Sequence, residues 1–252
     1  MIRFLLVLLI LIGYLVLLIP VLIAEWIYHK FNPQRADYQQ LRMVQAAFKL
    51  ILKVTGARIT VIGEEHVPKD QAVLYVGNHR SYFDILLTYS RTPRLTGYVA
   101  KKEMEKIPLL STWMKRLHCL FLDRKDIKEG LKTILAGIEL IKSGVSICIF
   151  PEGTRNRSNE PMLPFKEGSV KMAEKTGCLI IPMAITNSAE IFENHIPRIT
   201  PCDVIVEYGE PIDPKALSRE EKKFLGAYCQ KKIQEMLTAN QQKLGKPHSN
   251  TI

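Results

Sequence analysis

From residue 58 onward, short apolar runs alternate with segments of helical periodicity, and this alternation most limits the folds open to the chain. Helices placed between successive apolar strands are typical of a parallel sheet. We therefore predict an α/β fold with a largely parallel sheet flanked by helices. The predicted strands are 58–63, 72–77, 96–100, 119–123, 145–150, 178–185 and 203–208.

Three helices are expected within this part of the chain. The clearest covers residues 127–142, where isoleucine and leucine recur at helical spacing and form one apolar stripe. A second is expected over 166–175, ending before Gly177, because glycine readily adopts the left-handed conformation that often terminates a helix. A final basic helix is expected over 218–239.

Residues 4–24 contain no charged side chain and are rich in leucine, isoleucine and valine. A helix of this length crosses the roughly 30 Å of hydrocarbon in a bilayer. The main alternative is a cleaved signal peptide, whose apolar part is usually shorter and ends at small residues. We expect a retained membrane anchor. Because Gly13 and Pro20 interrupt the run, a spanning helix and a helix bent within one leaflet both remain open.

More basic residues follow the anchor than precede it. The positive-inside rule then places the rest of the chain on the cytoplasmic side of the cell membrane. Residues 38–55 are predicted to form an amphipathic helix whose apolar face carries Leu41, Val44, Phe48 and Ile51. That face suits either the membrane interface or the protein core, and periodicity alone does not choose between them.

The organisation expected from these patterns has three parts. An N-terminal anchor and amphipathic helix cover 1–56, a folded domain covers 57–245, and a frayed tail covers 246–252. The net charge of +10 attracts either nucleic acid or anionic lipid. Because the chain has no zinc-finger spacing and no RNA-binding aromatic signature, nucleic acid is not an expected partner. The five cysteines are scattered in apolar runs and are expected to be buried, reduced thiols.

A histidine and an aspartate stand five residues apart after the second predicted strand, within residues 78–84. Positions five apart point away from each other on a helix, so His79 and Asp84 cannot meet on one helical face. Ser81 and Asp84 match a capping box, which predicts that a helix begins at Ser81 and that His79 lies in the preceding turn. The imidazole can then fold back to Asp84, which would fix its tautomer for proton transfer. The plainer alternative is that Asp84 only caps the helix.

Two other strands also end in polar residues, at what should be the same edge of the sheet. Residues 150–155 supply Gly153, which permits close backbone approach, and Arg155, whose planar guanidinium suits phosphate. Arg124 follows another strand in the same way. Ligands of open α/β sheets bind at this edge, so the sequence predicts an anion-binding site, with solvated surface arginines as the alternative. A metal site is not expected, because one histidine and one aspartate are too few ligands.

Four of these segments together resemble the motifs of the glycerolipid acyltransferase family, and within it the 1-acyl-sn-glycerol-3-phosphate acyltransferases. They stand in family order and at family-like spacing. Lys101 and residues 163–166 are also similar to this subgroup. His118 and Cys119 stand where the family usually has a glycine, a departure that bears on acyl or head-group preference more than on reaction type. The four segments are 78–84, 121–124, 150–155 and 180–184.

The resemblance implies that His79 is a general base, oriented by Asp84, which activates the sn-2 hydroxyl of lysophosphatidate for attack on an acyl thioester. Phosphatidate would be the product, residues 57–245 the catalytic domain, and membrane lipids its surroundings. The thioester is acyl-CoA or acyl carrier protein, and no cofactor is implied. The substrate-binding residues that the resemblance implies are Lys101, Arg124, Glu152, Gly153, Thr154 and Arg155.

Three alternatives remain open. Ser81 is a rival nucleophile, although a capping role suits its hydroxyl better. A sibling acyltransferase would use glycerol 3-phosphate or another lysophospholipid as the acceptor. A non-catalytic, basic protein of the same fold would bind a membrane surface without consuming a thioester.

Overall fold

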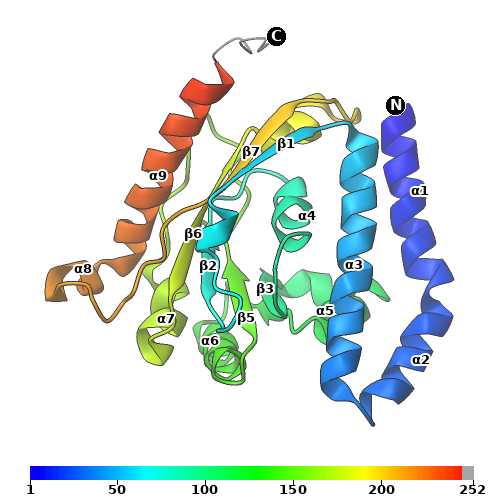
Figure 1. Cartoon of the computed structure of the whole chain (residues 1–252), viewed down its shortest axis with the longest axis horizontal. Coiled ribbons are helices and arrows are strands. Elements are labelled where there is room, and N and C mark those ends of the chain that lie inside the picture. The colour runs from blue at the N-terminus through cyan, green and yellow to red at the C-terminus, as the bar shows by residue number, and fades with distance from the viewer. Residues whose placement is uncertain (246–252) are drawn as a thin grey trace.

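The computed structural model describes residues 1–245, so the predicted tail 246–252 lies outside the described residues. Within this range, one sheet has the strand order β1-β7-β6-β2-β5-β3-β4 (Figure 1). Each predicted strand is present. Their bounds are β1 (Arg58–Ile62), β2 (Leu74–Gly77), β3 (Thr96–Lys101), β4 (Leu120–Leu122), β5 (Ser146–Ile149), β6 (Ile180–Thr186) and β7 (Asp203–Tyr208).

The sheet is largely parallel, as predicted. The neighbours from β6 to β4 are all parallel, and β1 is parallel to β7. The exception is the antiparallel pairing of β6 with β7, which reverses the two strands at one end of the sheet. The parallel strands β2, β5, β3 and β4 therefore deliver the residues that follow them to a common edge.

Helices cover both faces of the sheet (Figure 1). On one face lie α3 (Pro33–Thr55), α4 (Phe83–Tyr89) and α5 (Leu110–Arg116), and on the other α6 (Ile127–Lys142), α7 (Lys171–Thr176) and α9 (Leu225–Leu244). In β2, Tyr75 joins the core beneath α3 and α4, whereas Leu74 and Val76 join the core beneath α6 and α9. A strand buried on both faces reads as one continuous apolar run, which explains the sequence pattern.

The predicted helices differ from the observed ones in detail. Residues 166–175 contain a 3₁₀ turn, η3 (Glu167–Val170), before α7 begins, and α7 ends at Gly177 as expected, with φ of 69°. The predicted helix 218–239 is two helices, because the non-helical backbone of Phe224 separates α8 (Arg219–Lys223) from α9. The stripe of α6 is buried only toward its C-terminus, and Ile127 is 90% exposed.

The N-terminal apolar segment is not one straight helix. It consists of α1 (Ile2–Leu17) and α2 (Ile19–His29), which meet at an angle of 48°. Pro20 lies in the first turn of α2, where a missing backbone N–H costs little. Among residues 1–245 no single helix is long and apolar enough to cross a membrane, although the bent pair meets those criteria together.

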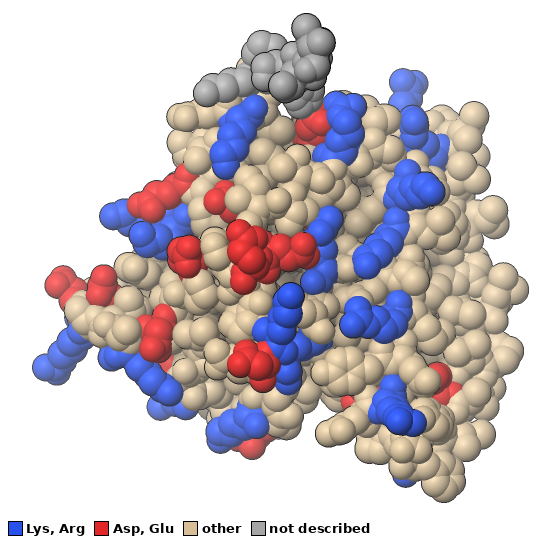
Figure 2. Space-filling model, viewed as in Figure 1, with Lys and Arg blue, Asp and Glu red and all other residues tan. Residues whose placement is uncertain are grey.

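One face of α1 packs against the protein and the other is exposed. Phe4, Val7, Ile10 and Tyr14 contact the core on the α3 side of the sheet. Figure 2 shows that the margin of the molecule formed by these N-terminal helices is almost free of charged side chains. The exposed apolar residues of α1 and α2 are Ile2, Leu5, Leu6, Leu8, Leu9, Leu11, Ile12, Val16, Leu17, Ile23, Trp26 and Ile27.

The amphipathic helix predicted over 38–55 is part of α3, which begins earlier, at Pro33. Leu41, Val44 and Ile51 are buried in the core that α3 shares with α4 and the sheet. Phe48 packs edge-on against Tyr89, with ring centroids 5.8 Å apart. Of the two interpretations of this apolar face, the structure supports core packing.

The five cysteines are free thiols, as expected. Cys148 and Cys229 are buried, and the other three are half-buried. Burial raises the pKa of Cys119 to about 11, so its protonated form dominates at neutral pH. Besides η3, the residues that the structure describes form four other short 3₁₀ segments, namely η1 (Glu64–His66), η2 (Lys102–Lys106), η4 (Ser188–Ile191) and η5 (Glu193–His195).

Candidate active site

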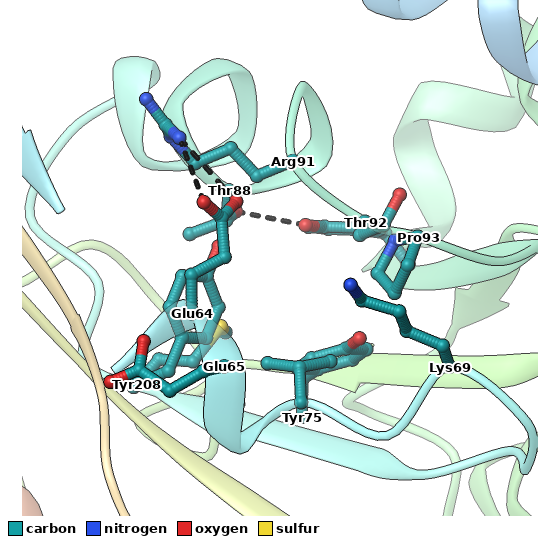
Figure 3. Close-up of a pocket in the computed structure, with 12 residues that line it drawn as sticks. Glu64, Glu65, Lys69, Tyr75, Thr88, Arg91, Thr92, Pro93 and Tyr208 are labelled. Atoms are coloured by element: carbon teal, nitrogen blue, oxygen red, sulfur yellow. Dashed lines mark hydrogen bonds and ion pairs between the residues drawn. The ribbon is translucent and has the colours of Figure 1, made fainter. Parts of the chain in front are cut away.

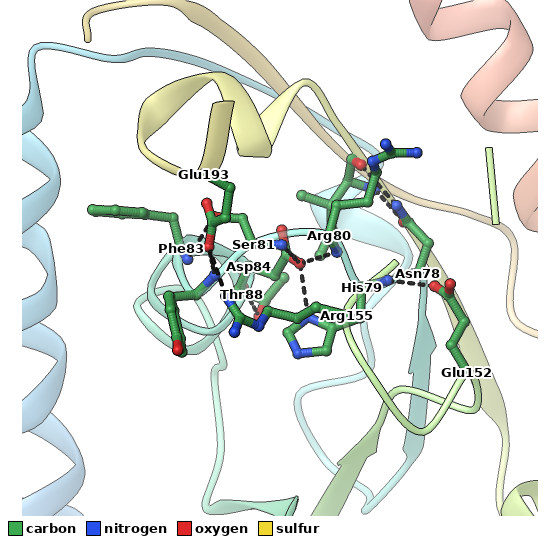
Figure 4. A network of polar contacts seen from close by, with 12 residues as sticks. Asn78, His79, Arg80, Ser81, Phe83, Asp84, Thr88, Glu152, Arg155 and Glu193 are labelled. Atoms are coloured by element: carbon green, nitrogen blue, oxygen red, sulfur yellow. Dashed lines mark hydrogen bonds and ion pairs between the residues drawn. The ribbon is translucent and has the colours of Figure 1, made fainter. Parts of the chain in front are cut away.

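The segments that carry the predicted site residues meet at one edge of the sheet. The neighbouring parallel strands β2 and β5 end at Gly77 and Ile149, and β3 and β4 lie beyond β5. Figure 4 shows the turn after β2 beside Glu152 and Arg155 from the loop after β5. The convergence expected from the strand pattern is therefore present.

His79 and Asp84 are in direct contact at this edge (Figure 4). His79 Nδ1 lies 2.8 Å from Asp84 Oδ2, and Asp84 is fully buried. Because an ionised carboxylate only accepts hydrogen bonds, Nδ1 carries the proton in this pair and Nε2 is the basic nitrogen. The imidazole also stacks on Phe150, with ring centroids 4.3 Å apart and planes 14° apart. This is the geometry of a general base held by an orienting carboxylate.

Asp84 also holds the turn that carries His79. The same oxygen, Oδ2, accepts hydrogen bonds from the backbone N–H groups of Arg80 (2.7 Å) and Ser81 (2.8 Å). The helix α4 begins at Phe83, two residues later than predicted, and Phe83 N–H donates to the Ser81 hydroxyl at 2.9 Å. The predicted cap is thus present in an altered form, in which Asp84 binds the turn and the histidine together.

The geometry gives no support to Ser81 as a nucleophile. Ser81 is fully buried, and its hydroxyl donates to Glu193 Oε2 at 2.6 Å while accepting from Phe83 N–H. The hydroxyl proton is therefore directed to Glu193, not to His79. A serine activated by a base would instead donate to the imidazole.

Glu152 binds the chain itself. Oε1 accepts from His79 N–H at 2.6 Å, and Oε2 accepts from Leu163 N–H at 2.8 Å. The residue is only 4% exposed. Burial raises the pKa of Glu152, while the two backbone donors act in the opposite direction. Each carboxylate oxygen thus has a partner, and Glu152 ties residues 150–155 to the backbone of the turn that carries His79.

The rest of this loop presents positive charge. Gly153 has φ of 73°, which glycine adopts without strain, and an added Cβ would lie 3.0 Å from Lys166 Nζ. Thr154 is exposed. The Arg155 guanidinium lies 3.5 Å from the centre of the Tyr82 ring, and its NH1 donates to Glu193 at 3.2 Å. Its other N–H groups make no hydrogen bond to another described residue, so they are available to an anion.

Lys101 and Arg124 lie farther along the same edge. Both are exposed, and Lys101 Nζ is 3.3 Å from a carboxylate oxygen of Glu103. Three strand spacings, or about 14 Å, separate β4 from β2. Neither side chain is hydrogen-bonded to the turn that carries His79.

Two residues support the site in ways that were not predicted, although Asn78 belongs to the segment 78–84. Asn78 is fully buried, and its side chain exchanges two hydrogen bonds with the backbone of Ile185, at 2.9 and 2.8 Å. It continues the β2–β6 ladder one residue beyond the strand, and its position directly after a buried strand was the available signal. Glu193 reaches the site from η5, and nothing near it in the sequence marks it as a site residue.

A cavity of about 440 Å³ lies under the far end of α4 (Figure 3). Its lining includes Tyr75, Tyr208 and Thr88, and the Thr88 hydroxyl is 2.8 Å from Tyr98 Oη. No residue of the four sequence motifs except Met183 lines it. It lies one helical turn beyond Asp84, since Thr88 also donates to the Asp84 backbone carbonyl at 2.7 Å.

Within residues 1–245 no cluster of three or more His, Cys, Asp or Glu residues is arranged to hold a metal ion.

Comparison with known proteins agrees with this geometry. Residues 58–186 match the model of the family described as Acyltransferase. A 1-acyl-sn-glycerol-3-phosphate acyltransferase of Borreliella burgdorferi is 32% identical over 77% of this chain and 78% of its own length. The enzyme of the same name from Saccharomyces cerevisiae is 28% identical over 80% of this chain and 65% of its own.

A solved structure extends the similarity to nearly the whole fold. The 1-acyl-sn-glycerophosphate acyltransferase of Thermotoga maritima superimposes with a TM-score of 0.80 and 26% sequence identity, covering 95% of each chain. The family resemblance drawn from the four motifs is therefore confirmed. The matched residues include the His79–Asp84 pair as well as Arg124 and Arg155, which follow β4 and β5. The chain belongs to the acyltransferase family.

Proposed function

We propose that the chain transfers an acyl group from a thioester to the sn-2 hydroxyl of 1-acyl-glycerol 3-phosphate, giving phosphatidate and a free thiol. The observation that carries this proposal is the 2.8 Å contact between His79 Nδ1 and the buried Asp84 carboxylate. The choice of acceptor is supported by the names of the relatives from Borreliella burgdorferi and Thermotoga maritima.

His79 supplies the proton transfer in this reaction. Nε2 accepts the proton of the sn-2 hydroxyl as the oxygen attacks the thioester carbonyl. When the tetrahedral intermediate collapses, the C–S bond breaks and the imidazolium returns the proton to the leaving thiolate. Asp84 stabilises the imidazolium and keeps the tautomer correct. Proton transfer of this kind contributes about 10²–10⁴-fold to the rate.

The acceptor phosphate is bound by the cations beside the turn. Arg155 is nearest to the catalytic turn, and Lys166 lies over Gly153 in the same loop. The planar guanidinium suits bidentate contact with phosphate oxygens. Arg124 and Lys101 stand farther along the edge, where they suit the anionic groups of a long ligand. In this proposal Glu152, Gly153 and Thr154 shape the loop.

The acyl donor is acyl-CoA or acyl carrier protein. Both supply the same thioester, and the steps above use only side chains of this chain, so we propose no additional cofactor. The exposed charges of Lys101 and Arg124 suit the anionic groups of either donor. Assays with each donor separate the two.

The N-terminal helices support attachment to a membrane. The exposed face of α1 and α2 is apolar, while the opposite face of α1 packs on the protein, an arrangement that suits insertion into one leaflet. Phe4 in the first turn of α1 stacks on Phe192, so insertion would bring the catalytic edge to the lipid surface that supplies the acceptor. The basic residues that follow favour the cytoplasmic side of the cell membrane.

The test is an assay of thiol release by the full chain in phospholipid vesicles. The acceptors are lysophosphatidate, glycerol 3-phosphate and a lysophospholipid with a larger head group, each with acyl-CoA and with acyl carrier protein. We expect release with lysophosphatidate, and its loss in His79→Ala without loss of helical circular dichroism. Near-normal turnover by His79→Ala would refute the mechanism.

The same assay distinguishes the alternatives. Release mainly with glycerol 3-phosphate or with the larger lysophospholipid would assign a different acceptor within the family. Binding to anionic vesicles without thiol release for any acceptor would instead identify a membrane-surface binding protein. Orientation is read separately, from the accessibility of an introduced cysteine near the catalytic edge in intact cells.

A further inference from the structure

Glu193 joins two parts of the site that are distant in sequence, the turn after β2 and the loop after β5 (Figure 4). Its Oε1 accepts hydrogen bonds from Tyr82 N–H at 2.7 Å and from Arg155 NH1 at 3.2 Å. Its Oε2 accepts from the Ser81 hydroxyl at 2.6 Å. One carboxylate therefore connects the catalytic turn after β2 with the arginine of the loop after β5.

The Arg155 guanidinium is held on two sides by these contacts. Tyr82 lies against its face at 3.5 Å, and Glu193 engages one of its edges. Arginine has five N–H donors, and Glu193 accepts a hydrogen bond from one of the two terminal nitrogens. Only 17% of the Arg155 side chain and 14% of the Glu193 side chain are exposed, so water screens the pair weakly. The remaining donors are thereby fixed in direction before a ligand arrives.

The segment that carries Glu193 is itself anchored by α1. Phe192 stacks on Phe4 with ring centroids 5.6 Å apart and an angle of 9° between the planes. The next residue is Glu193, at the start of η5. Packing therefore restricts the backbone from which the carboxylate projects, which makes Glu193 a fixed support.

We propose that Glu193 is a positioning residue that sets the direction of the Arg155 guanidinium for the acceptor phosphate. This inference rests on the proposed function for the identity of the acceptor. Glu193 itself does not touch the substrate and transfers no proton. It is not part of the four motifs from which the family was identified, and its role follows from its three contacts alone.

The experiment is a double-mutant cycle between Glu193 and Arg155. In Glu193→Gln the amide oxygen still accepts from Tyr82 N–H, so the turn keeps its backbone contact, but the charge beside Arg155 is lost. We expect kcat/KM for lysophosphatidate to fall about 10-fold, the size of one hydrogen bond to a charged group, with an unchanged KM for the thioester. In an Arg155→Ala background the same substitution should cost clearly less, because Arg155 is already absent and only the loss of the acceptor of the Ser81 hydroxyl remains.

Glu190→Gln is the matched control. Glu190 lies three residues earlier, in η4. Its carboxylate accepts from Asn194 and pairs with His195 at 2.8 Å, and it makes no contact with the turn after β2 or the loop after β5. It should leave kcat/KM within 2-fold of the parent value. Glu193→Asp retains the charge on a shorter side chain and should recover part of the loss if charge is the main contribution.

A binding measurement separates failure of this inference from failure of the proposed function. In a His79→Ala background, which removes turnover, the Kd of a short-chain lysophosphatidate should rise about 10-fold on Glu193→Gln and remain unchanged on Glu190→Gln. If the parent protein shows no thiol release, the proposed function fails while this coupling can still be measured. Independent effects of Glu193→Gln and Arg155→Ala, multiplying in both assays, would overturn the positioning role.

Discussion

The edge of the sheet that carries the proposed active site has two halves, and their charged side chains are held differently. Around the turn after β2, Asp84 and Glu152 are buried and bind backbone amides through short hydrogen bonds. At the ends of β3 and β4, Lys101 and Arg124 are exposed. The first half is fixed by its own chain, and the second is open to solvent.

This difference matches two different chemical requirements. Proton transfer requires heavy atoms within hydrogen-bond distance in a fixed orientation, and the buried contacts of the turn provide that. Attraction of an anionic ligand requires charge near the correct place, which long, exposed cations supply with less geometric constraint. Substitutions in the first half should therefore affect both stability and turnover, and those in the second should mainly affect binding.

The largest effect is expected for Glu152→Ala. Two partly buried N–H groups, on His79 and Leu163, lose their acceptor, and a buried polar group left unsatisfied costs about 1–3 kcal/mol. The free energy of unfolding should fall by about that amount in denaturant titration, and kcat should fall because the turn of His79 is no longer held. Glu235→Ala, on the exposed surface of α9, is the control and should change neither quantity. Equal stability of the two variants would show that the backbone contacts of Glu152 do not stabilise the fold.

A smaller, pH-dependent effect is expected for Glu152→Gln. Burial raises the pKa of Glu152 in the folded state above its ordinary value of 4.5. Between pH 4.5 and the raised pKa of the folded state, the folded protein binds more protons than the unfolded chain. The free energy of unfolding therefore decreases as pH rises through this range. The stability of the parent protein relative to Glu152→Gln should therefore fall from about pH 4.5 to the folded pKa and then level off. The slope is at most about 1.4 kcal/mol per pH unit. A relative stability that rises with pH in this range would contradict the sign.

The smallest effect is expected at the exposed half of the edge. Arg124→Ala should raise the KM of an anionic substrate by about 2- to 5-fold without changing kcat or stability, because the side chain is exposed. Since salt screens exposed charges, the difference from the parent protein should shrink as ionic strength increases. Lys101→Ala should behave in the same way, and steady-state kinetics in low and high salt measure both. A large loss of kcat for Arg124→Ala would show that Arg124 acts like the residues of the first half, around the turn after β2.

The contacts that could be predicted from the sequence are those between residues close together in the chain. The His79–Asp84 pair joins residues five apart, and the need for a turn between them followed from helix geometry alone. The seven strands followed from apolar runs. These features depend on residues that are neighbours in the sequence, where periodicity and spacing carry information.

The strand pattern predicted which distant segments meet at the edge of the sheet, but not the individual contacts between them. The partners of Glu152 are backbone amides, which carry no sequence signal. Glu193 reaches the turn from η5, and the antiparallel pairing of β6 with β7 depends on the path of the chain between them. The bend between α1 and α2 was allowed by the sequence without being required by it.

The stacking of Phe4 on Phe192 has a practical consequence for any shortened form of this protein. Removal of α1 and α2 is an obvious way to obtain a protein that is easier to purify, since it eliminates most of the exposed apolar surface. The same deletion also removes Phe4, whose ring stacks on Phe192, the residue before Glu193. A truncated protein that is folded and soluble should therefore not be assumed to retain native catalysis, and a bulky fusion at the N-terminus lies close enough to the catalytic edge to require the same check.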